Sequence, residues 1–266
     1  MIDLHNHLIP GVDDGAVDLA ESVQMVRQYL ESGYRGAVCT SHYYPGGYET
    51  TRQLIDEGIG LLSQELLRQG LEFDLYPGNE LFLDMDTVEK LNAEEVYSLN
   101  NSRFVLLELP FQTEPNYGMN MVYQLQLKGY VPILAHCERY TYVQKNTDWL
   151  LEYIRKGCLI QGNLSSLRSP EDSSTRKTLL ELMDRHMIHF LCTDAHGTQL
   201  RSPAVADLFP QLKERLGEGR FQRILVDNPR KVVQNQFLSS SYDDIPVVEN
   251  QEKPKKRTLF ERFFRK

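Results

Sequence analysis

Short apolar runs recur along the chain, and between them lie stretches in which apolar residues return every three or four positions. The apolar runs, which predict buried strands, lie at 2–5, 36–41, 73–78, 104–109, 131–135, 159–163 and 189–193. The stretches with helical periodicity lie at 19–32, 51–69, 117–128, 147–156, 174–186, 203–216 and 229–237. Strands that alternate with helices in this way predict parallel β/α units.

Two helix starts carry recognisable signals. Asp18 is followed three residues later by Glu21, which resembles a capping box. Asn228 precedes Pro229, which predicts an N-cap with proline at the first helical position. The two signals support the helices predicted at 19–32 and 229–237.

The loop after the first run helps to choose between a closed barrel and an open sheet. No Gly-x-Gly-x-x-Gly or Walker-type loop follows residues 2–5, which weakens the option of an open nucleotide-binding sheet. In a barrel the active site lies at the carboxyl ends of the strands. Those ends are therefore where functional residues are expected.

The composition is that of a globular protein. The chain has 266 residues, of which 41% are apolar, enough for the core of one large domain. It has no apolar run of eighteen residues and no secretory signal, so we expect a cytoplasmic protein. The four cysteines are isolated within or beside apolar runs, which favours reduced core residues over disulfides. The net charge of −8 argues against general nucleic-acid binding.

The C-terminal segment differs in charge from the rest. Residues 253–266 carry seven positive side chains and one negative, and the polar stretch 239–244 before them resembles a linker. We therefore expect one domain over 1–238 and a linker with a basic tail over 239–266. Four apolar tail residues would share one face of a helix: Leu259, Phe260, Phe263 and Phe264. This predicts an interfacial helix at a membrane surface or a partner, with a tail lacking fixed structure as the alternative.

Imidazoles and carboxylates follow six of the seven predicted strands. His5 and His7 stand two residues apart, so on a strand their side chains would point to one face. The residues at the strand ends are His5, His7, His42, Glu80, Glu108, His136, Asp194 and His196. Only the run 159–163 ends in neither type. Carboxylates are depleted from cores unless paired or bound to metal, so the set predicts a metal site.

The types of ligand indicate which chemistry to expect. Mixed imidazole and carboxylate ligands suit manganese, iron or zinc, and the lack of thiolates argues against a structural zinc site. Eight ligands imply at least two ions with a bridging carboxylate, and two ions about 3.5–4 Å apart are usual in phosphoester hydrolysis. Arg139 and Arg201 follow the last imidazoles and would bind phosphate oxygens with their guanidinium groups.

A cysteine-dependent phosphatase is excluded by spacing. That chemistry requires Cys-x5-Arg, but Val143 stands six residues after Cys137. The other cysteines have Pro45, Leu164 and Thr198 at that position. Any phosphatase activity is therefore expected to depend on metal ions.

The complete set of motifs resembles the polymerase-and-histidinol-phosphatase (PHP) superfamily. The opening Asp3-Leu-His-Asn-His-Leu-Ile-Pro-Gly-Val-Asp-Asp-Gly15 is similar, more specifically, to the CpsB/CapC-type bacterial tyrosine-protein phosphatases. The same likeness is carried by Thr40-Ser41-His42, Gly78-Asn79-Glu80, Ala135-His136-Cys-Glu-Arg139 and Thr193-Asp194-Ala-His196. It covers about residues 1–238.

This resemblance implies a distorted (β/α)7 TIM-like barrel, the PHP fold, with three metal ions and usually manganese. Carried onto the matching positions, it implies that the first ion is held by His5, His7, Glu80 and Asp194. It implies that the second is held by Glu80, Glu108 and His136. It implies that the third is held by Asp14, His42 and His196. Many superfamily members have histidine where Asp14 and Glu108 stand, and carboxylates there fit the tyrosine-phosphatase branch.

The resemblance also implies the reaction and the partner. The substrate would be a phosphotyrosine protein, a bacterial tyrosine kinase that controls capsule or exopolysaccharide synthesis. A hydroxide bridging the metal ions would attack in line, while Arg139 and Arg201 bind the phosphoryl oxygens. His42 or a metal-bound water would protonate the leaving phenolate. A position at the inner face of the membrane and a homo-oligomer both remain open.

Three other functions fit the sequence less well. A PHP phosphoesterase for a small phosphate, such as histidinol phosphate or a nucleotide, is disfavoured by Glu108 and the Asp-Asp-Gly loop. A carbon–nitrogen amidohydrolase commonly has a bridging lysine, and no predicted strand here ends in one. A scaffold domain stabilised by metal would leave some ligands dispensable, and none is missing.

Overall fold

The computed structural model describes residues 1–240, and the predicted tail helix within 253–266 lies outside the described residues. Its strands are β1 (Ile2–Asp3), β2 (Gly36–Cys39), β3 (His42–Tyr43), β4 (Asp74–Pro77), β5 (Glu80–Phe82), β6 (Phe104–Glu108), β7 (Val131–Leu134), β8 (Leu159–Asn163) and β9 (Phe190–Cys192). The predicted runs 36–41 and 73–78 differ from this result. Each is a shorter strand that bends at its end and resumes as a second one, β3 after β2 and β5 after β4.

The helices largely follow the predicted periodicity. They are α1 (Leu19–Glu31), α2 (Arg52–Arg68), α3 (Thr87–Asn92), α4 (Gly118–Leu127), α5 (Thr141–Lys145), α6 (Trp149–Arg155), α7 (Ser174–Asp184), α8 (Phe209–Leu216), α9 (Glu218–Gln222) and α10 (Asn228–Val233). Helices α3, α5 and α9 were not predicted. The helix predicted from residue 203 begins only at Phe209, after a short 3-10 turn at Ala206–Leu208.

The two predicted helix starts have different outcomes. The Asp18 side chain accepts a hydrogen bond from Glu21 N at 2.9 Å, as a cap should. The Glu21 carboxylate accepts from Val17 N instead of closing the capping box on Asp18. The prediction that Asn228 is an N-cap is wrong, because the backbone is already helical before it. Its side chain instead donates to His189 O.

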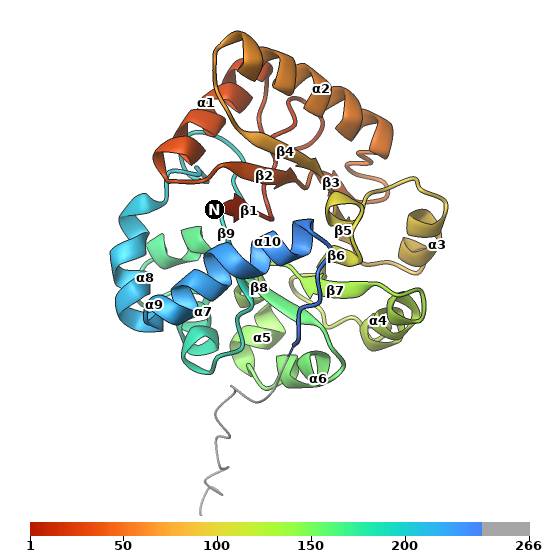
Figure 1. Ribbon diagram of the computed structural model, residues 1–266. Coiled ribbons are helices and arrows are strands. Elements are labelled where there is room, and N and C mark those ends of the chain that lie inside the picture. Colours follow the sequence, from red (N-terminus) through yellow and green to blue (C-terminus); the bar gives the residue numbers. More distant parts are fainter. Residues whose placement is uncertain (241–266) are drawn as a thin grey trace, which may run out of the picture.

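The strands form a curled, wholly parallel arrangement with helices on the outside (Figure 1). One sheet has the order β1-β2-β4 and the other has the order β3-β5-β6-β7-β8-β9. A parallel bridge between Asn6 and Ala195 joins the segments that follow β1 and β9. The first and last strands of the chain therefore meet, and this brings the carboxyl ends of strands from both sheets together.

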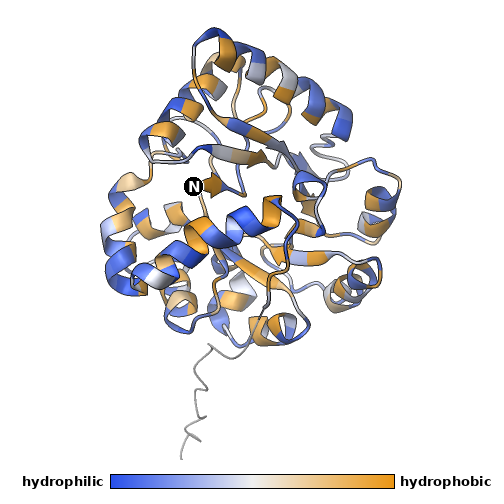
Figure 2. Cartoon of the chain, viewed as in Figure 1, coloured by the Kyte–Doolittle hydropathy of each residue, from blue (hydrophilic) through white to orange (hydrophobic). Residues whose placement is uncertain are grey.

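Alternation along the strands divides the core into two layers. On β6, Phe104 and Leu106 belong to an inner apolar cluster, while Val105 and Leu107 pack in the outer layer against helices. Glu108 continues the inward-facing series at the strand's end. The helices carry hydrophobic and hydrophilic bands, as Figure 2 shows. The inner apolar layer therefore lies beneath the residues at the carboxyl ends of the strands.

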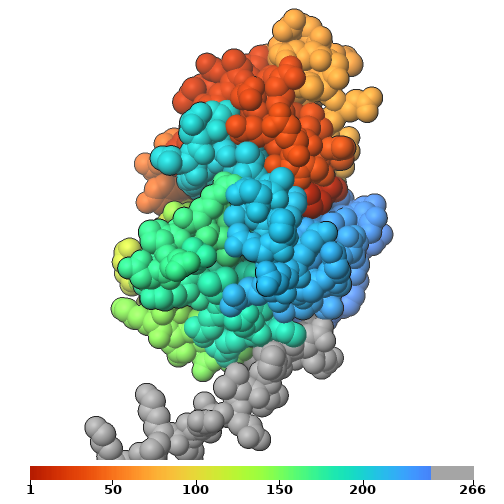
Figure 3. Space-filling view, turned by 90° about the vertical axis from the view of Figure 1, so that its left-hand side faces the viewer, coloured from red at the N-terminus to blue at the C-terminus, as the bar shows by residue number. Residues whose placement is uncertain are grey.

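Distant parts of the chain pack side by side on one flank. In Figure 3 the cyan and blue segment that follows β9 lies against the red N-terminal segment. Gln28 on α1 donates to Thr198 O at 3.1 Å, and Ser32 donates to Pro203 O at 3.0 Å. These bonds fix the segment that carries His196 relative to α1.

Two further sequence predictions can be compared with the described residues. All four cysteines are buried and free, which confirms their assignment to the core. Among the described residues, none of the helices combines the length and apolar character needed to cross a membrane.

Candidate metal centre and active site

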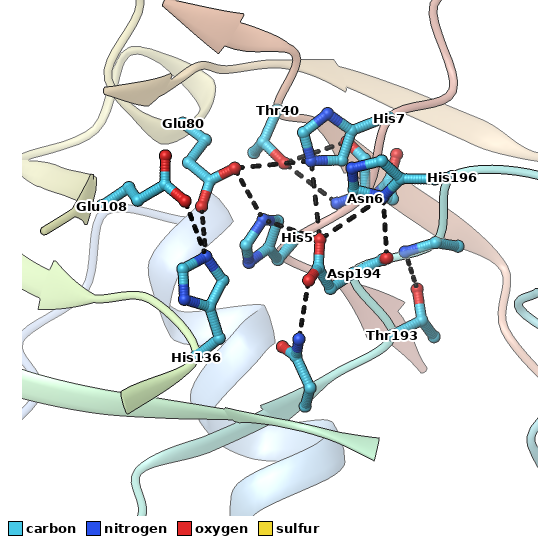
Figure 4. Close-up of polar contacts among 12 residues, drawn as sticks. His5, Asn6, His7, Thr40, Glu80, Glu108, His136, Thr193, Asp194 and His196 are labelled. Carbon is cyan, nitrogen blue, oxygen red and sulfur yellow. Dashed lines mark hydrogen bonds and ion pairs between the residues drawn. The ribbon is translucent and has the colours of Figure 1, made fainter. Parts of the chain in front are cut away.

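Nine predicted ligands converge at the carboxyl edge of the curled sheet, as the close-up in Figure 4 shows for most of them. They come from the segment after β1, from β3, β5 and β6, and from the segments after β7 and β9. The nine are His5, His7, Asp14, His42, Glu80, Glu108, His136, Asp194 and His196. Residues as far apart in the sequence as His5 and His196 therefore share one site.

The innermost group consists of two imidazoles and two carboxylates. His5 Nε2 lies 3.2 Å from Glu80 Oε2 and 3.3 Å from Asp194 Oδ1. His7 Nε2 lies 3.4 Å and 3.6 Å from the same two oxygens. All four atoms are buried, and none of them has a hydrogen-bond partner within the described part of the chain. Buried polar atoms without partners are costly, so a divalent cation between these four fits their chemistry.

Hydrogen bonds from behind set the tautomers of these imidazoles. His5 Nδ1 donates to Gln161 Oε1 at 3.1 Å. His7 Nδ1 donates to Asp13 Oδ2 at 2.7 Å. Each bond leaves Nε2 facing the carboxylates, which is how metal-binding histidines are usually oriented.

The adjacent carboxylates Asp13 and Asp14 have different positions. Asp13 is buried behind His7, whereas Asp14 Oδ1 lies 3.5 Å from His42 Nε2 and 3.4 Å from His196 Nε2. The close approach of the backbone at Gly15 to His7 allows this, because a Cβ there would collide with His7. Asp14, His42 and His196 therefore form a second group beside the first.

A third group shares Glu80. His136 Nε2 lies 2.8 Å from Glu80 Oε1 and 3.5 Å from Glu108 Oε1. His42 Nδ1 lies 3.1 Å from Glu80 Oε2 and 3.9 Å from Glu108 Oε2. Glu80 thus contacts imidazoles of all three groups, as a bridging carboxylate would.

Burial and neighbouring charges shift the pKa values of the cluster residues in different directions. Burial lowers the pKa of His5, but Glu80 and Asp194 outweigh it and raise that pKa to about 9. Burial, followed by the charge of Glu80, raises the pKa of Glu108 to about 8. Burial lowers the pKa of His136 to about 4. Protons and metal ions compete for the same lone pairs, so the carboxylates that hold a proton on His5 also favour a divalent cation.

Two of the site residues have strained backbones. His136 has φ 32° and Asp194 has φ 50°, both in the left-handed region that disfavours side chains with a Cβ. Strain of this kind collects at functional sites, where the surrounding structure holds it in place. Both residues turn the chain sharply at a strand end and direct a ligand atom into the cluster.

The two predicted arginines lie beside the cluster. Arg139 Nη1 is 3.3 Å and Arg201 Nη2 is 2.6 Å from Asp194 Oδ2, and each side chain is 36% exposed. The Arg139 guanidinium lies over the ring of Phe111, 4.7 Å from its centroid. Both arginines line an open cleft of about 460 Å³ together with Phe111, Gln112, Asn163, Ser165, Ser166, Ser169, Thr175 and Asp194. Positive charge in such a cleft suits a phosphoryl group.

No site residue was predicted on the strand 159–163, yet β8 supports the centre. Gln161 accepts from both His5 and the backbone nitrogen of His136, the latter at 2.7 Å. Asn163 Nδ2 donates to Asp194 Oδ2 at 2.6 Å. The available signal was the alternation: both are polar, two residues apart, on the same face as the inner-layer residue Leu159.

Substitution of Asp13 is expected to weaken metal binding without removing a ligand. In Asp13→Asn the charge behind His7 is lost, so we expect the affinity for Mn²⁺ to fall about 10–100-fold. Calorimetric titration of the metal-free protein measures this. Asp18→Asn is the matched control, because asparagine caps α1 as well as aspartate does. Equal affinities in the two variants would contradict a supporting role for Asp13.

Fold and site together define a class: α/β proteins with a multinuclear metal-type centre at the carboxyl edge of a curled parallel sheet and arginines at its mouth. Family comparison is more specific. The model of the family described as "Capsular polysaccharide synthesis, CpsB/CapC" matches residues 1–234. The chain belongs to this family.

Individual relatives agree with the family match. The tyrosine-protein phosphatase YwqE of Bacillus subtilis is 30% identical over 238 residues, which is 90% of this chain and 93% of the relative. The tyrosine-protein phosphatase CpsB of Streptococcus agalactiae is 27% identical over 243 residues, 90% and 100% of the two chains. A crystal structure from work on YwqE of B. subtilis and CpsB of Streptococcus pneumoniae, described as unique metal-dependent tyrosine phosphatases, superposes with a TM-score of 0.83. It is 30% identical and covers 90% of this chain and 96% of its own.

Proposed function

We propose that this protein is a metal-dependent tyrosine-protein phosphatase. The observation that carries the proposal is the convergence of four buried ligand atoms that have no hydrogen-bond partner among residues 1–240, on His5, His7, Glu80 and Asp194. The relatives described as tyrosine-protein phosphatases and metal-dependent tyrosine phosphatases support the choice of reaction.

The proposed centre holds two to three ions, with Mn²⁺ as the first choice and iron, zinc or magnesium as alternatives. The ligands proposed for the first ion are His5, His7, Glu80 and Asp194. Those for the second are Glu80, Glu108 and His136, and those for the third are Asp14, His42 and His196. When bound, such ions supply an activated water and neutralise developing phosphoryl charge. The sevenfold count of the barrel belongs to the same proposal, with β2 and β3 as one bent strand and β4 and β5 as another.

The side chains around the ions have separate tasks. Arg139 and Arg201 would bind the phosphoryl oxygens from the cleft and hold the phosphorus in line for attack. Both nitrogens of His42 face carboxylates, at Glu80 and Asp14, which supports a ligand role over proton donation to the phenolate.

The proposed substrate is a phosphotyrosine protein, a bacterial tyrosine kinase of capsule or exopolysaccharide synthesis. The family description supports this setting. The enzyme would act in the cytoplasm at the inner face of the membrane, where such a kinase would present its phosphotyrosines. The domain proposed for the reaction is 1–238.

An assay with three substrates tests the proposal. Phosphotyrosine peptide, phosphoserine peptide and histidinol phosphate are compared with Mn²⁺ and with EDTA. We expect preference for phosphotyrosine and loss of activity on chelation. Preference for histidinol phosphate would instead support a small-molecule phosphoesterase, and activity unchanged by EDTA would exclude the metal mechanism.

Cys137 provides a test of the mechanism itself. Its thiol is buried, and burial raises its pKa well above the usual range, so it stays protonated. Cys137→Ser is therefore expected to keep phosphatase activity within about twofold. Steady-state kinetics on phosphotyrosine peptide measure this, and loss of activity with an intact circular-dichroism spectrum would point to a cysteine nucleophile.

The basic segment 253–266 is proposed to bring the enzyme to an anionic membrane surface. The apolar face and flanking cations of its sequence support this. Full-length protein is expected to float with anionic liposomes, and a variant ending at residue 250 is expected to remain in the soluble fraction. Equal flotation of the two proteins would exclude the membrane role.

A further inference from the structure

The turn between β3 and α2 is held rigidly beside the metal-type cluster. Tyr44 N donates to Tyr48 O at 2.5 Å, and Gly47 N donates to Tyr44 O at 3.0 Å. Tyr43 and Glu49 add an antiparallel bridge on either side of these bonds. The ring of Tyr44 packs on the turn, because a Cβ at Gly47 would lie 2.5 Å from its Cδ1. These contacts set the backbone positions from which the two tyrosines project.

Both tyrosine rings are partly exposed, and the ring of Tyr48 lies next to a proposed metal ligand. The ring of Tyr48 lies nearly parallel to that of His42, with an interplanar angle of 12° and centroids 6.1 Å apart. Tyr44 packs edge-on against Phe82 with centroids 4.8 Å apart. Tyr44 is 44% and Tyr48 42% exposed. Exposed aromatic surface beside a cluster of polar ligands suits contact with a substrate.

Phe111, a third aromatic residue near the site, is already engaged. Phe111 lies beneath the Arg139 guanidinium and stacks on His136 with centroids 5.3 Å apart. Its contacts hold the arginine side of the cleft. Tyr44 and Tyr48 therefore present the more accessible aromatic surface beside the cluster.

We propose that the turn over residues 43–49 determines specificity by receiving the phenyl ring of the phosphotyrosine substrate on Tyr48 and the adjoining polypeptide on Tyr44. The inference rests on the proposed phosphatase function and extends it. The ring of phosphotyrosine is joined to phosphorus through a single oxygen, so it must lie close to the groups that surround the phosphate, and His42 is one of the proposed metal ligands there. Tyr48 offers a flat wall next to His42, and offset stacking of two rings is favourable. An alkyl phosphate such as phosphoserine has no ring to place there.

The test separates contact with the ring from contact with phosphate. In full-length, Mn²⁺-loaded protein, Tyr48→Leu keeps apolar bulk but removes the flat ring, and Tyr44→Ala removes the second contact. We expect each to raise the KM for phosphotyrosine peptide at least about threefold. The inhibition constant of inorganic phosphate should change less than twofold, because the proposed phosphate contacts, Arg139 and Arg201, lie outside the turn. Tyr48→Phe keeps the flat ring and should have the KM of the wild type. Tyr123 is an exposed tyrosine on α4, and Tyr123→Ala is the matched control.

Each other outcome contradicts a defined part of the inference. An unchanged KM in Tyr48→Leu and Tyr44→Ala overturns the recognition role. Equal changes in KM and in the phosphate inhibition constant also overturn it, since they would show that Tyr48 only supports His42. A wild-type protein that binds Mn²⁺ but does not hydrolyse phosphotyrosine overturns the proposed function itself.

Discussion

Glu80→Ala is expected to reduce turnover of phosphotyrosine peptide by at least about a hundredfold. Substituting a residue that only hydrogen-bonds to a metal ligand already lowers metal affinity or activity by about 10–100-fold, and Glu80 is a proposed ligand itself. Glu80 is buried and lies within 3.5 Å of four imidazoles, those of His5, His7, His42 and His136. Its removal leaves the proposed first and second ions without their shared ligand. Steady-state kinetics and the metal content of the purified protein, by atomic emission, should fall together.

A matched control separates loss of the site from loss of the fold. Glu72→Ala removes an exposed carboxylate from the loop before β4 and is expected to change neither activity nor metal content. Circular dichroism should show that both variants are folded. If Glu80→Ala bound as much metal as the wild type and turned over substrate normally, Glu80 would not be a bridging ligand.

Arg139→Ala is expected to lower kcat/KM for phosphotyrosine peptide at least about tenfold, through loss of a charge-assisted bond to the phosphoryl group. The side chain is partly exposed at the cleft, held over Phe111 and within 3.3 Å of Asp194 Oδ2. The inhibition constant of inorganic phosphate should rise in parallel. Arg139→Lys should recover only part of the activity, because an ammonium group keeps the charge but not the planar fork.

Arg139 also contacts Asp194, a proposed metal ligand, so the metal content of Arg139→Ala must be measured. Metal content equal to the wild type would assign the loss to phosphate binding, as expected. A metal-depleted Arg139→Ala would show that the arginine acts by holding Asp194 instead. Arg230→Ala, on the exposed side of α10, is the matched control for removing a guanidinium group.

Most of the elements could be predicted from local patterns. The apolar run at 104–109 became β6 because alternate residues face two apolar layers, and the periodic stretch 19–32 became α1 with Asp18 as its cap. The early ends of the strands predicted at 36–41 and 73–78, and the short second strands that follow them, could not be predicted. Their bends depend on long-range bonds, such as those from Asn79 Nδ2 to Ser41 O and Thr50 O.

The candidate ligands could be predicted because carboxylates and imidazoles are rarely left at the ends of buried strands without a partner. The supporting residues were harder to recognise. Gln161 and Asn163 are ordinary polar residues in the sequence, and their contacts to His5, His136 and Asp194 come from other strands. Nothing local distinguishes Asp13 from Asp14, although one supports His7 and the other faces His42 and His196.

The sequence by itself determined the strand and helix pattern, the nature of the ligands and their place at the strand ends, since these depend on periodicity and on the chemistry of individual side chains. Only the tertiary structure decided which ligand atoms meet, which bonds orient each imidazole, and that the Tyr44–Tyr48 turn lies beside His42. Those features depend on how the sheet curls and how bent strands align. The physical reason is that contacts between residues far apart in the chain are set by the packing of the whole fold, not by neighbouring positions.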